Sequence, residues 1–150
     1  SMSKVYALSG ARVAYLCAPE PVAAALRCVT PPWAVSLPAQ VAAVMALKDP
    51  QYYAERHRET HQLRTQLVQD LLACTRLEVI PSAANFVLCH LPIDGPDAAT
   101  VCERCRGCGV FLRNPASMSP RLGAHALRIA VKDGPQNSRI VEVLRQALQG

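Results

Sequence analysis

The spacing of apolar residues changes about halfway along the chain, and this change limits the chain to folds that combine helices with a sheet. Before it, Leu63, Leu67 and Leu71 recur every fourth residue, which is the spacing of one face of an α-helix. After it, the segments LEVI (77–80) and NFVLCHL (85–91) are short apolar runs around a Pro-Ser turn, as is typical of strands. A striped helix and a strand pair bury their apolar faces by packing against other elements.

The rest of the chain alternates between the same two patterns. Prolines and glycines separate the segments and mark where each helix begins or ends. The expected order is a strand at 12–17, helices at 19–28, 38–48 and 50–74, strands at 77–80 and 85–91, a helix at 96–106, strands at 110–113 and 126–131, and a last helix after 134. This order predicts an α+β fold (α/β family) with a mixed sheet and packed helices.

Composition narrows the class of protein. The chain has 150 residues, 51% of them hydrophobic, which suits one globular domain or a domain with an appendage. No run of 18 apolar residues and no leader-like start is present, so we expect neither a membrane span nor a secretory signal. The seven cysteines are then expected to stay reduced in the cytoplasm. The net charge of +5 comes mostly from scattered arginines, which does not favour nucleic-acid binding.

Two groups of residues have spacings that resemble metal sites. Cys102, Cys105 and Cys108 could ligate zinc or an iron–sulfur cluster, but no fourth ligand lies at a recognisable spacing. His57 and His61 lie four residues apart in HRETH, whose glutamate is misplaced for the known zinc-enzyme motifs. We therefore expect no metal site, and instead partly buried helix cysteines and a solvated histidine face.

The first twelve residues, SMSKVYALSGAR, contain the groups needed to hold a phosphorylated aldehyde. The Lys4 amine can condense with a carbonyl, and the Ser1 and Ser3 hydroxyls can donate to a phosphate. Arg12 follows eight residues later and offers a guanidinium fork to the same phosphate. Pyridoxal phosphate carries both an aldehyde and a phosphate, although serine–lysine patterns also occur on ordinary surfaces.

The pattern S-x-S-K-x-x-x-L-x-G-x-R resembles the cofactor-lysine segment of the class I/II aminotransferases, the fold-type I pyridoxal-phosphate enzymes. The segments PPWAVSLPAQVAA, IPSAANFVL, CGVFLRN and HALRIAVKDGPQNSRIVEVL continue the resemblance in the family's order. The later ones are similar to the branch of histidinol-phosphate aminotransferases and threonine-phosphate decarboxylases. The resemblance implies that residues 1–33 are a remnant of the large cofactor-binding domain, with its lysine segment, a strand and a helix. Residues 34–150 would form the small C-terminal domain.

The resemblance also implies roles for the residues of the lysine segment. Lys4 would be the catalytic Schiff-base lysine and proton shuttle. Arg12 would bind the phosphate of the cofactor, pyridoxal 5'-phosphate, with help from Ser1 and Ser3.

Three later residues would contact the substrate. Arg113 and Arg128 would hold its anionic group, a phosphate or a carboxylate, and Asn85 would lie in the same pocket. Judged from the residues alone, Arg128 could instead be a surface arginine on an edge strand. Asn85 could likewise be a strand-start residue bonded to its own backbone.

The family's chains are more than twice as long as this one. The part not represented here supplies the acidic partner of the pyridine nitrogen and the aromatic ring that stacks on the cofactor. We therefore expect weak cofactor binding and no efficient turnover from this chain alone. The full-length enzyme would be a homodimer acting on an amino acid or amino-phosphate. The alternative is a non-catalytic binding or oligomerisation module that keeps the aminotransferase fold.

Overall fold

The computed structural model describes residues 1–149, except for the side chains of Cys74 and Pro120. The chain divides into two compact units, Ser1–His57 and Arg58–Gly150, and each is described by itself. Helix α4 (Pro50–Cys74) contributes residues to both. Within the described residues, no helix combines the length and apolar character that crossing a membrane requires.

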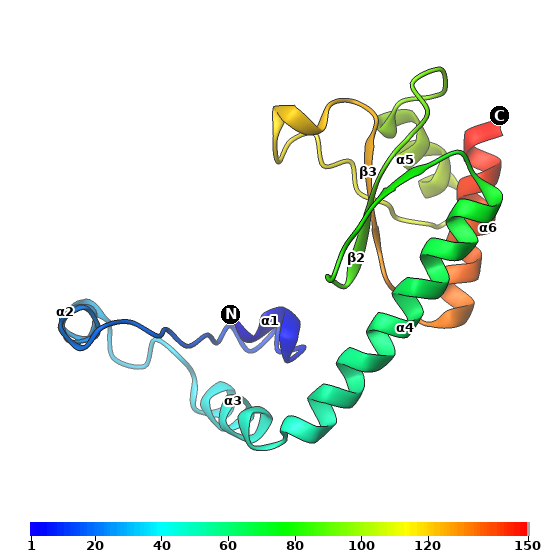
Figure 1. Cartoon of the computed structure of the whole chain (residues 1–150). Coiled ribbons are helices and arrows are strands. Elements are labelled where there is room, and N and C mark those ends of the chain that lie inside the picture. Colours follow the sequence, from blue (N-terminus) through cyan, green and yellow to red (C-terminus); the bar gives the residue numbers. More distant parts are fainter. Residues whose placement is uncertain (150) are drawn as a thin grey trace. The chain divides into compact units, whose positions relative to one another are not determined.

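The first unit contains α1 (Met2–Val5), α2 (Glu20–Val29), α3 (Leu37–Lys48) and the start of α4 (Figure 1). Proline lies in the first turn of α2 and of α3, where its missing N–H costs nothing. The Asp49 carboxylate accepts a hydrogen bond from the Tyr52 amide at 3.1 Å and so caps α4. The helices expected at 19–28, 38–48 and 50–74 are confirmed to within about two residues.

The core of the first unit is small. It consists of Met2, Val13 and a stripe of three alanines along α3 (Ala39, Ala43 and Ala46). The larger apolar residues of α3 remain exposed, with Val41 at 55% and Met45 at 61%. Although α3 is apolar nearly all round, its narrow alanine stripe is the part that is buried in this chain. Helix α2 buries no residue at all.

The strand expected at 12–17 does not form. Residues 13–19 have no regular structure, and a single backbone bond, Met2 N–H to the Val13 carbonyl at 3.2 Å, links this segment to α1. A strand requires a neighbouring strand to accept and donate its backbone hydrogen bonds, and apolar content alone does not supply one. The assignment of residues 1–33 to a larger domain stays a prediction.

The second unit is built on three strands, β1 (Glu78–Ile80), β2 (Phe86–His90) and β3 (Ala126–Ala130), in the order β1-β2-β3. These strands were expected and are confirmed. Both pairings are antiparallel, so the mixed sheet is wrong for the described residues; pairing direction is a tertiary property that local apolar patterns do not determine. The strand expected at 110–113 is reduced to one bridge, between Arg113 and Arg128.

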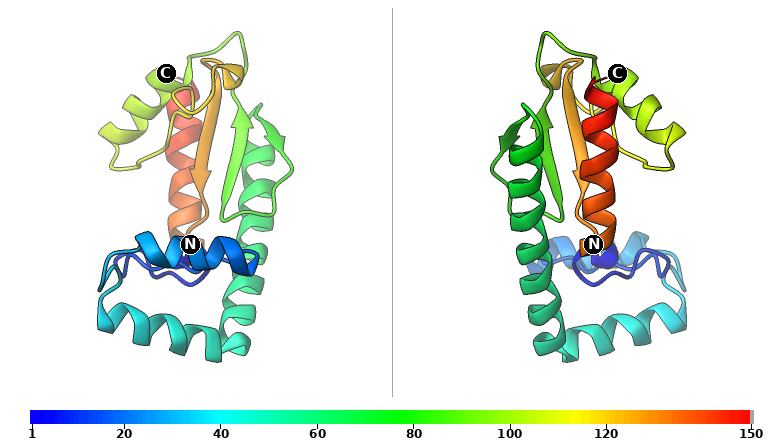
Figure 2. Two further views of the ribbon diagram at one scale, coloured as in Figure 1. Left: turned by 90° about the vertical axis from the view of Figure 1, so that its left-hand side faces the viewer. Right: turned by 90° about the vertical axis from the view of Figure 1, so that its right-hand side faces the viewer.

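Helices cover one face of this sheet. Side chains alternate between faces along a strand, and Val87, Cys89, Leu127 and Ile129 all lie on the buried face. They form one core with residues of α4, of α5 (Ala98–Gly107) and of α6 (Gly134–Gln149). Figure 2 shows α6 lying along β3. The opposite face carries the half-buried side chains of β2 and β3, and it is the face on which the arginines lie.

Candidate active site

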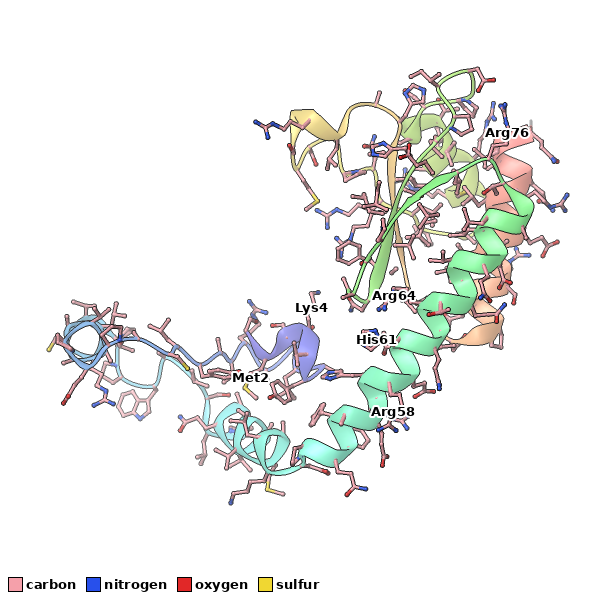
Figure 3. The ribbon with its side chains drawn as sticks, in the orientation of Figure 1. Met2, Lys4, Arg58, His61, Arg64 and Arg76 are labelled. Atoms are coloured by element: carbon pink, nitrogen blue, oxygen red, sulfur yellow. The ribbon has the colours of Figure 1, made fainter. Side chains whose placement is uncertain are left out.

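One methionine, Met2, anchors the lysine segment in the core of the first unit. Met2 is 1% exposed and packs in the core of the first unit. Its amide donates to the Val13 carbonyl and its carbonyl accepts from the Leu8 amide, both at 3.2 Å. In Figure 3, Met2 and Lys4 lie on opposite sides of α1. Burying the methionine therefore leaves the lysine amine in solvent, where it can react.

Two side chains from α4 hold the residues that follow the lysine. A ring nitrogen of His57 (Nε2) lies 3.1 Å from the Val5 carbonyl oxygen, and as an N–H it donates there. The Tyr53 hydroxyl donates to the Tyr6 carbonyl at 3.5 Å, and the two tyrosine rings meet edge to face with centroids 4.8 Å apart. His57 is thus not simply a solvated histidine, as the sequence suggested.

The phosphate donors predicted for the cofactor are joined on one turn. The Ser1 and Ser3 hydroxyls are hydrogen-bonded at 3.0 Å. Ser9 links them to the arginine, because its hydroxyl donates to the Ser3 carbonyl at 2.7 Å while its own carbonyl accepts from Arg12 at 3.0 Å. Serine is common in turns, and no spacing in the sequence distinguishes Ser9 from an ordinary turn residue.

Arg12 has a left-handed backbone. Its φ is +52°, and that of Ala7 in the same turn is +54°. For residues other than glycine this conformation costs of the order of 1–3 kcal/mol and recurs at functional sites. Within residues 1–149, the guanidinium of Arg12 donates one hydrogen bond to protein, through one nitrogen, and a guanidinium carries five N–H donors. Donors therefore remain for an external anion.

Arg113 and Arg128 lie directly opposite one another in the second unit. The Arg113 amide donates to the Arg128 carbonyl at 3.1 Å, and the Arg128 amide donates back at 2.9 Å. Directly opposed residues of an antiparallel pair place their side chains on the same face. Arg128 also faces Leu88 across the sheet, and its guanidinium carbon lies 4.0 Å from the centre of the Phe86 ring.

This pairing places two positive charges next to each other. Like charges directly opposite on a sheet are destabilising, and the described residues show no carboxylate that pairs with either arginine, in contrast to Arg76, which pairs with Asp94 at 3.0 Å. A bound anion would relieve this repulsion, and the Phe86 ring would leave the edge of the Arg128 guanidinium free to bind it.

Asn85 lies directly before β2 and is exposed. Its carbonyl accepts from the Val131 amide at 3.0 Å. The local side chain–backbone bonds expected at Asn85 are instead made by Ser82, whose hydroxyl accepts from the Ala84 amide at 3.1 Å and donates to the Phe86 carbonyl at 3.2 Å. The Asn85 side chain is exposed just before the strand that carries Phe86 and Leu88, and its place in the substrate pocket stays a prediction.

The cysteines and histidines whose spacings resemble metal sites make other contacts in the structure. No cluster of three potential ligands occurs among the described residues. Cys102 and Cys105 are buried in the second core, and burial raises the pKa of Cys105 to about 11. His61 lies 2.7 Å from an Arg64 nitrogen.

Two aspartates cap helices, and two others bond to side chains. Asp97 accepts from the Thr100 amide and Asp133 from the Gln136 amide, both at 2.9 Å. Asp94 pairs with Arg76, and Asp70 accepts from Gln66 on the same helix. All four of these carboxylates already have a hydrogen-bond or ion-pair partner in the chain.

Comparison with known proteins decides the family. The model of the family described as aminotransferase class I and II matches residues 1–144. The chain belongs to the class I and II aminotransferase family. Histidinol-phosphate aminotransferase 1 of Caulobacter vibrioides is 35% identical over 150 residues, which cover 97% of this chain and 40% of that relative. This aminotransferase chain thus spans about two fifths of the length of the curated relatives it matches.

Solved aminotransferase-fold structures superpose on the chain. The histidinol-phosphate aminotransferase from Clostridium acetobutylicum gives a TM-score of 0.87 at 24% identity, over 97% of this chain and 43% of that one. L-threonine-O-3-phosphate decarboxylase from Porphyromonas gingivalis gives 0.83 at 23%, over 97% and 44%. The Sinorhizobium meliloti histidinol-phosphate aminotransferase, in complex with pyridoxal-5'-phosphate, gives 0.76 at 24%, over 98% and 39%. At these identities the likeness shows the fold.

Proposed function

We propose that this chain is the C-terminal part of a pyridoxal-phosphate-dependent aminotransferase and that Lys4 is its cofactor lysine. The observation that carries the proposal is the turn of residues 1–12, on which hydrogen bonds link two hydroxyls to a strained arginine, with the exposed Lys4 amine on the same turn. Membership of the aminotransferase family supports the reaction class. The relative solved with pyridoxal-5'-phosphate supports the choice of cofactor.

The donors of this turn fit the cofactor. When bound, pyridoxal phosphate supplies an aldehyde that condenses with amines and a ring that withdraws electrons. Lys4 would hold the aldehyde and later move a proton at its Nζ atom. The Arg12 guanidinium would bind the phosphate together with the Ser1 and Ser3 hydroxyls. The buried Met2 would fix the position of the turn that carries these groups.

The paired arginines support an anionic substrate of the amino-phosphate class. Arg113 and Arg128 lie opposite each other without a carboxylate partner in residues 1–149, and a phosphate dianion neutralises two guanidiniums where a carboxylate neutralises one. The exposed amide of Asn85 would donate to the same substrate. The names of the curated relatives, histidinol-phosphate aminotransferases, agree with this class.

The proposal covers a larger enzyme. Residues 1–33 would belong to its cofactor-binding domain and residues 34–150 to its small domain, and the enzyme would work as a homodimer. In residues 1–57, the Asp49 and Glu55 carboxylates accept hydrogen bonds from residues of α4, and Glu20 lies in the first turn of α2. The partner of the pyridine nitrogen would come from another part of the enzyme. The 150-residue chain alone would bind the cofactor weakly and turn over no substrate efficiently.

Borohydride trapping tests the role of Lys4. The chain contains three lysines, Lys4, Lys48 and Lys132, and the last two serve as internal controls. With dilute pyridoxal phosphate and borohydride, we expect the pyridoxyl label to accumulate on Lys4 about tenfold faster than on Lys48 or Lys132. One charge-assisted hydrogen bond to the phosphate contributes roughly that factor in affinity. Peptide mass spectrometry reads the label at each lysine.

Arg12→Met is the matched variant for this experiment. It removes the phosphate fork but leaves the amine, so the preference for Lys4 should fall toward that of the other lysines. Equal labelling of all three lysines in the unmodified chain would show that residues 1–12 hold no cofactor site.

A further inference from the structure

Arg64 makes two contacts that no role assigned so far explains. It lies on α4 within the second unit and is half-buried. One terminal nitrogen donates to the Ala84 carbonyl at 2.9 Å, and the other lies 2.7 Å from His61 Nδ1. Figure 3 shows His61 and Arg64 projecting from the same side of α4. With both terminal nitrogens engaged, the plane of the guanidinium is fixed.

The carbonyl that Arg64 holds belongs to a short loop leading into the arginine-bearing face. Residues 81–85 join β1 to β2. Within this loop the Ser82 hydroxyl accepts from the Ala84 amide and donates to the Phe86 carbonyl. The Phe86 ring in turn lies 4.0 Å from the guanidinium carbon of Arg128. A continuous series of contacts therefore runs from Arg64 to the substrate arginine.

We propose that Arg64 is a positioning residue for the anion-binding site, a role that rests on the proposed function of Arg113 and Arg128. By holding the Ala84 carbonyl, Arg64 sets the conformation of residues 81–85 and so the place of the Phe86 ring beneath Arg128. His61 contributes by orienting the Arg64 fork. The arginine itself does not contact the anion.

The competing explanation is that Arg64 only ties α4 to a loop and contributes stability. It is reasonable because Arg64 lines a groove with Val68, Pro81 and Val87, and its stem covers apolar surface there. The two explanations differ in one respect. If Arg64 only stabilises the fold, substituting it changes the unfolding midpoint. If it is a positioning residue, substituting it also changes the affinity of the folded chain for an anion.

Inorganic phosphate is the probe, titrated into the 150-residue chain and followed through the amide NMR signals of Arg113 and Arg128. We expect Arg64→Met to weaken phosphate binding about three- to tenfold, the size of indirect coupling between contacting groups. Arg64→Lys, which can still donate to the Ala84 carbonyl, should recover part of this loss. His61→Ala should weaken binding by less than Arg64→Met, because the bond to Ala84 remains.

Arg58→Met is the matched control, because it removes the same charge from an exposed position on the same helix. Its phosphate affinity should equal that of the unmodified chain. Urea unfolding of every variant ensures that affinities are compared on folded protein; if Arg64→Met does not fold, Arg64→Lys and His61→Ala carry the comparison.

The outcomes separate the two proposals. If Arg128→Met abolishes phosphate binding while Arg64→Met, Arg64→Lys and His61→Ala bind as tightly as the unmodified chain, the positioning role is wrong and the anion site stands. If phosphate shifts neither Arg113 nor Arg128, or if Arg128→Met binds normally, the anion site is wrong and the role of Arg64 is lost with it.

Discussion

Asn137 is a polar side chain inside an apolar core, and both ends of its amide are bonded. It is 4% exposed. Its Nδ2 donates to the Lys132 carbonyl and its Oδ1 accepts from the Lys132 amide, each at 2.9 Å. The side chain thereby closes the turn between β3 and α6. Both hydrogen bonds of the Lys132 backbone in this turn are made with Asn137. Losing the side chain would leave this amide and carbonyl without those partners, which costs free energy of folding.

Asn137→Ala should lower the free energy of unfolding by about 1–3 kcal/mol, because it leaves the Lys132 amide and carbonyl without their partner. Urea unfolding followed by circular dichroism measures the change. Gln136→Ala is the control, since it removes only an exposed hydrogen bond to Asp133, and it should stay within about 0.5 kcal/mol of the unmodified chain. Equal effects of the two changes on the free energy of unfolding would mean that the two hydrogen bonds between Asn137 and Lys132 do not stabilise the fold.

The candidate site shows which residue roles a sequence can predict. Ser1, Ser3, Lys4 and Arg12 lie within twelve residues, so a local pattern was enough to group them. The opposition of Arg113 and Arg128 depends on pairing of segments fifteen residues apart, and only the family resemblance placed them together. Arg64 was missed, because its partner Ala84 is brought near by packing of α4 against the sheet and no spacing in the sequence announces it.

Helix α5 depends on a charged cap at its first turn. The Asp97 carboxylate accepts from the Thr100 amide at 2.9 Å. This backbone bond, followed by the bond to the Thr100 side chain, lowers the pKa of Asp97 below its usual value. A lowered folded-state pKa contributes stability that is present above the unfolded pKa of about 3.9 and is lost as the pH falls through the folded one.

Asp97→Asn should therefore weaken the acid dependence of stability. An asparagine still caps the helix but does not titrate, so its urea midpoint should fall less than that of the unmodified chain between about pH 5 and pH 2. Asp70→Asn serves as the control because the hydrogen bond that Asp70 accepts comes from the Gln66 side chain on α4 and not from a helix-end amide. Parallel pH profiles for the unmodified chain and Asp97→Asn would contradict the expectation.

Elements were predicted more accurately where their stability is local. The helices with proline or aspartate at their first turns begin within about two residues of their expected starts, because caps act on the adjacent backbone. The segments at 12–17 and 110–113 were wrong or reduced to a bridge, since a strand exists only with a partner. The antiparallel direction of the sheet was missed for the same reason.

At the scale of the whole molecule, the two units differ in how much they bury. The second has a continuous core beneath its sheet, whereas α2 in the first buries no side chain. Local opening is cheap where few apolar contacts are lost. The two units should therefore differ in how readily their backbones open.

Amide hydrogen exchange tests this difference. We expect amides of α2 to exchange at least about 100-fold faster than those of α6, a helix whose Ile140 and Leu144 are buried. Comparing helix with helix removes differences in hydrogen-bond pattern. Equal protection of α2 and α6 would show that burial does not govern the opening of this chain.

The exposed connector between α2 and α3 has an optical consequence. Trp33 is the single tryptophan of the chain, and its side chain is 92% exposed on a backbone with φ of +56°. An indole in water fluoresces at longer wavelength than one shielded by apolar surface. The emission wavelength of Trp33 therefore reports, without any attached dye, whether another protein surface binds over the exposed apolar side chains of the first unit.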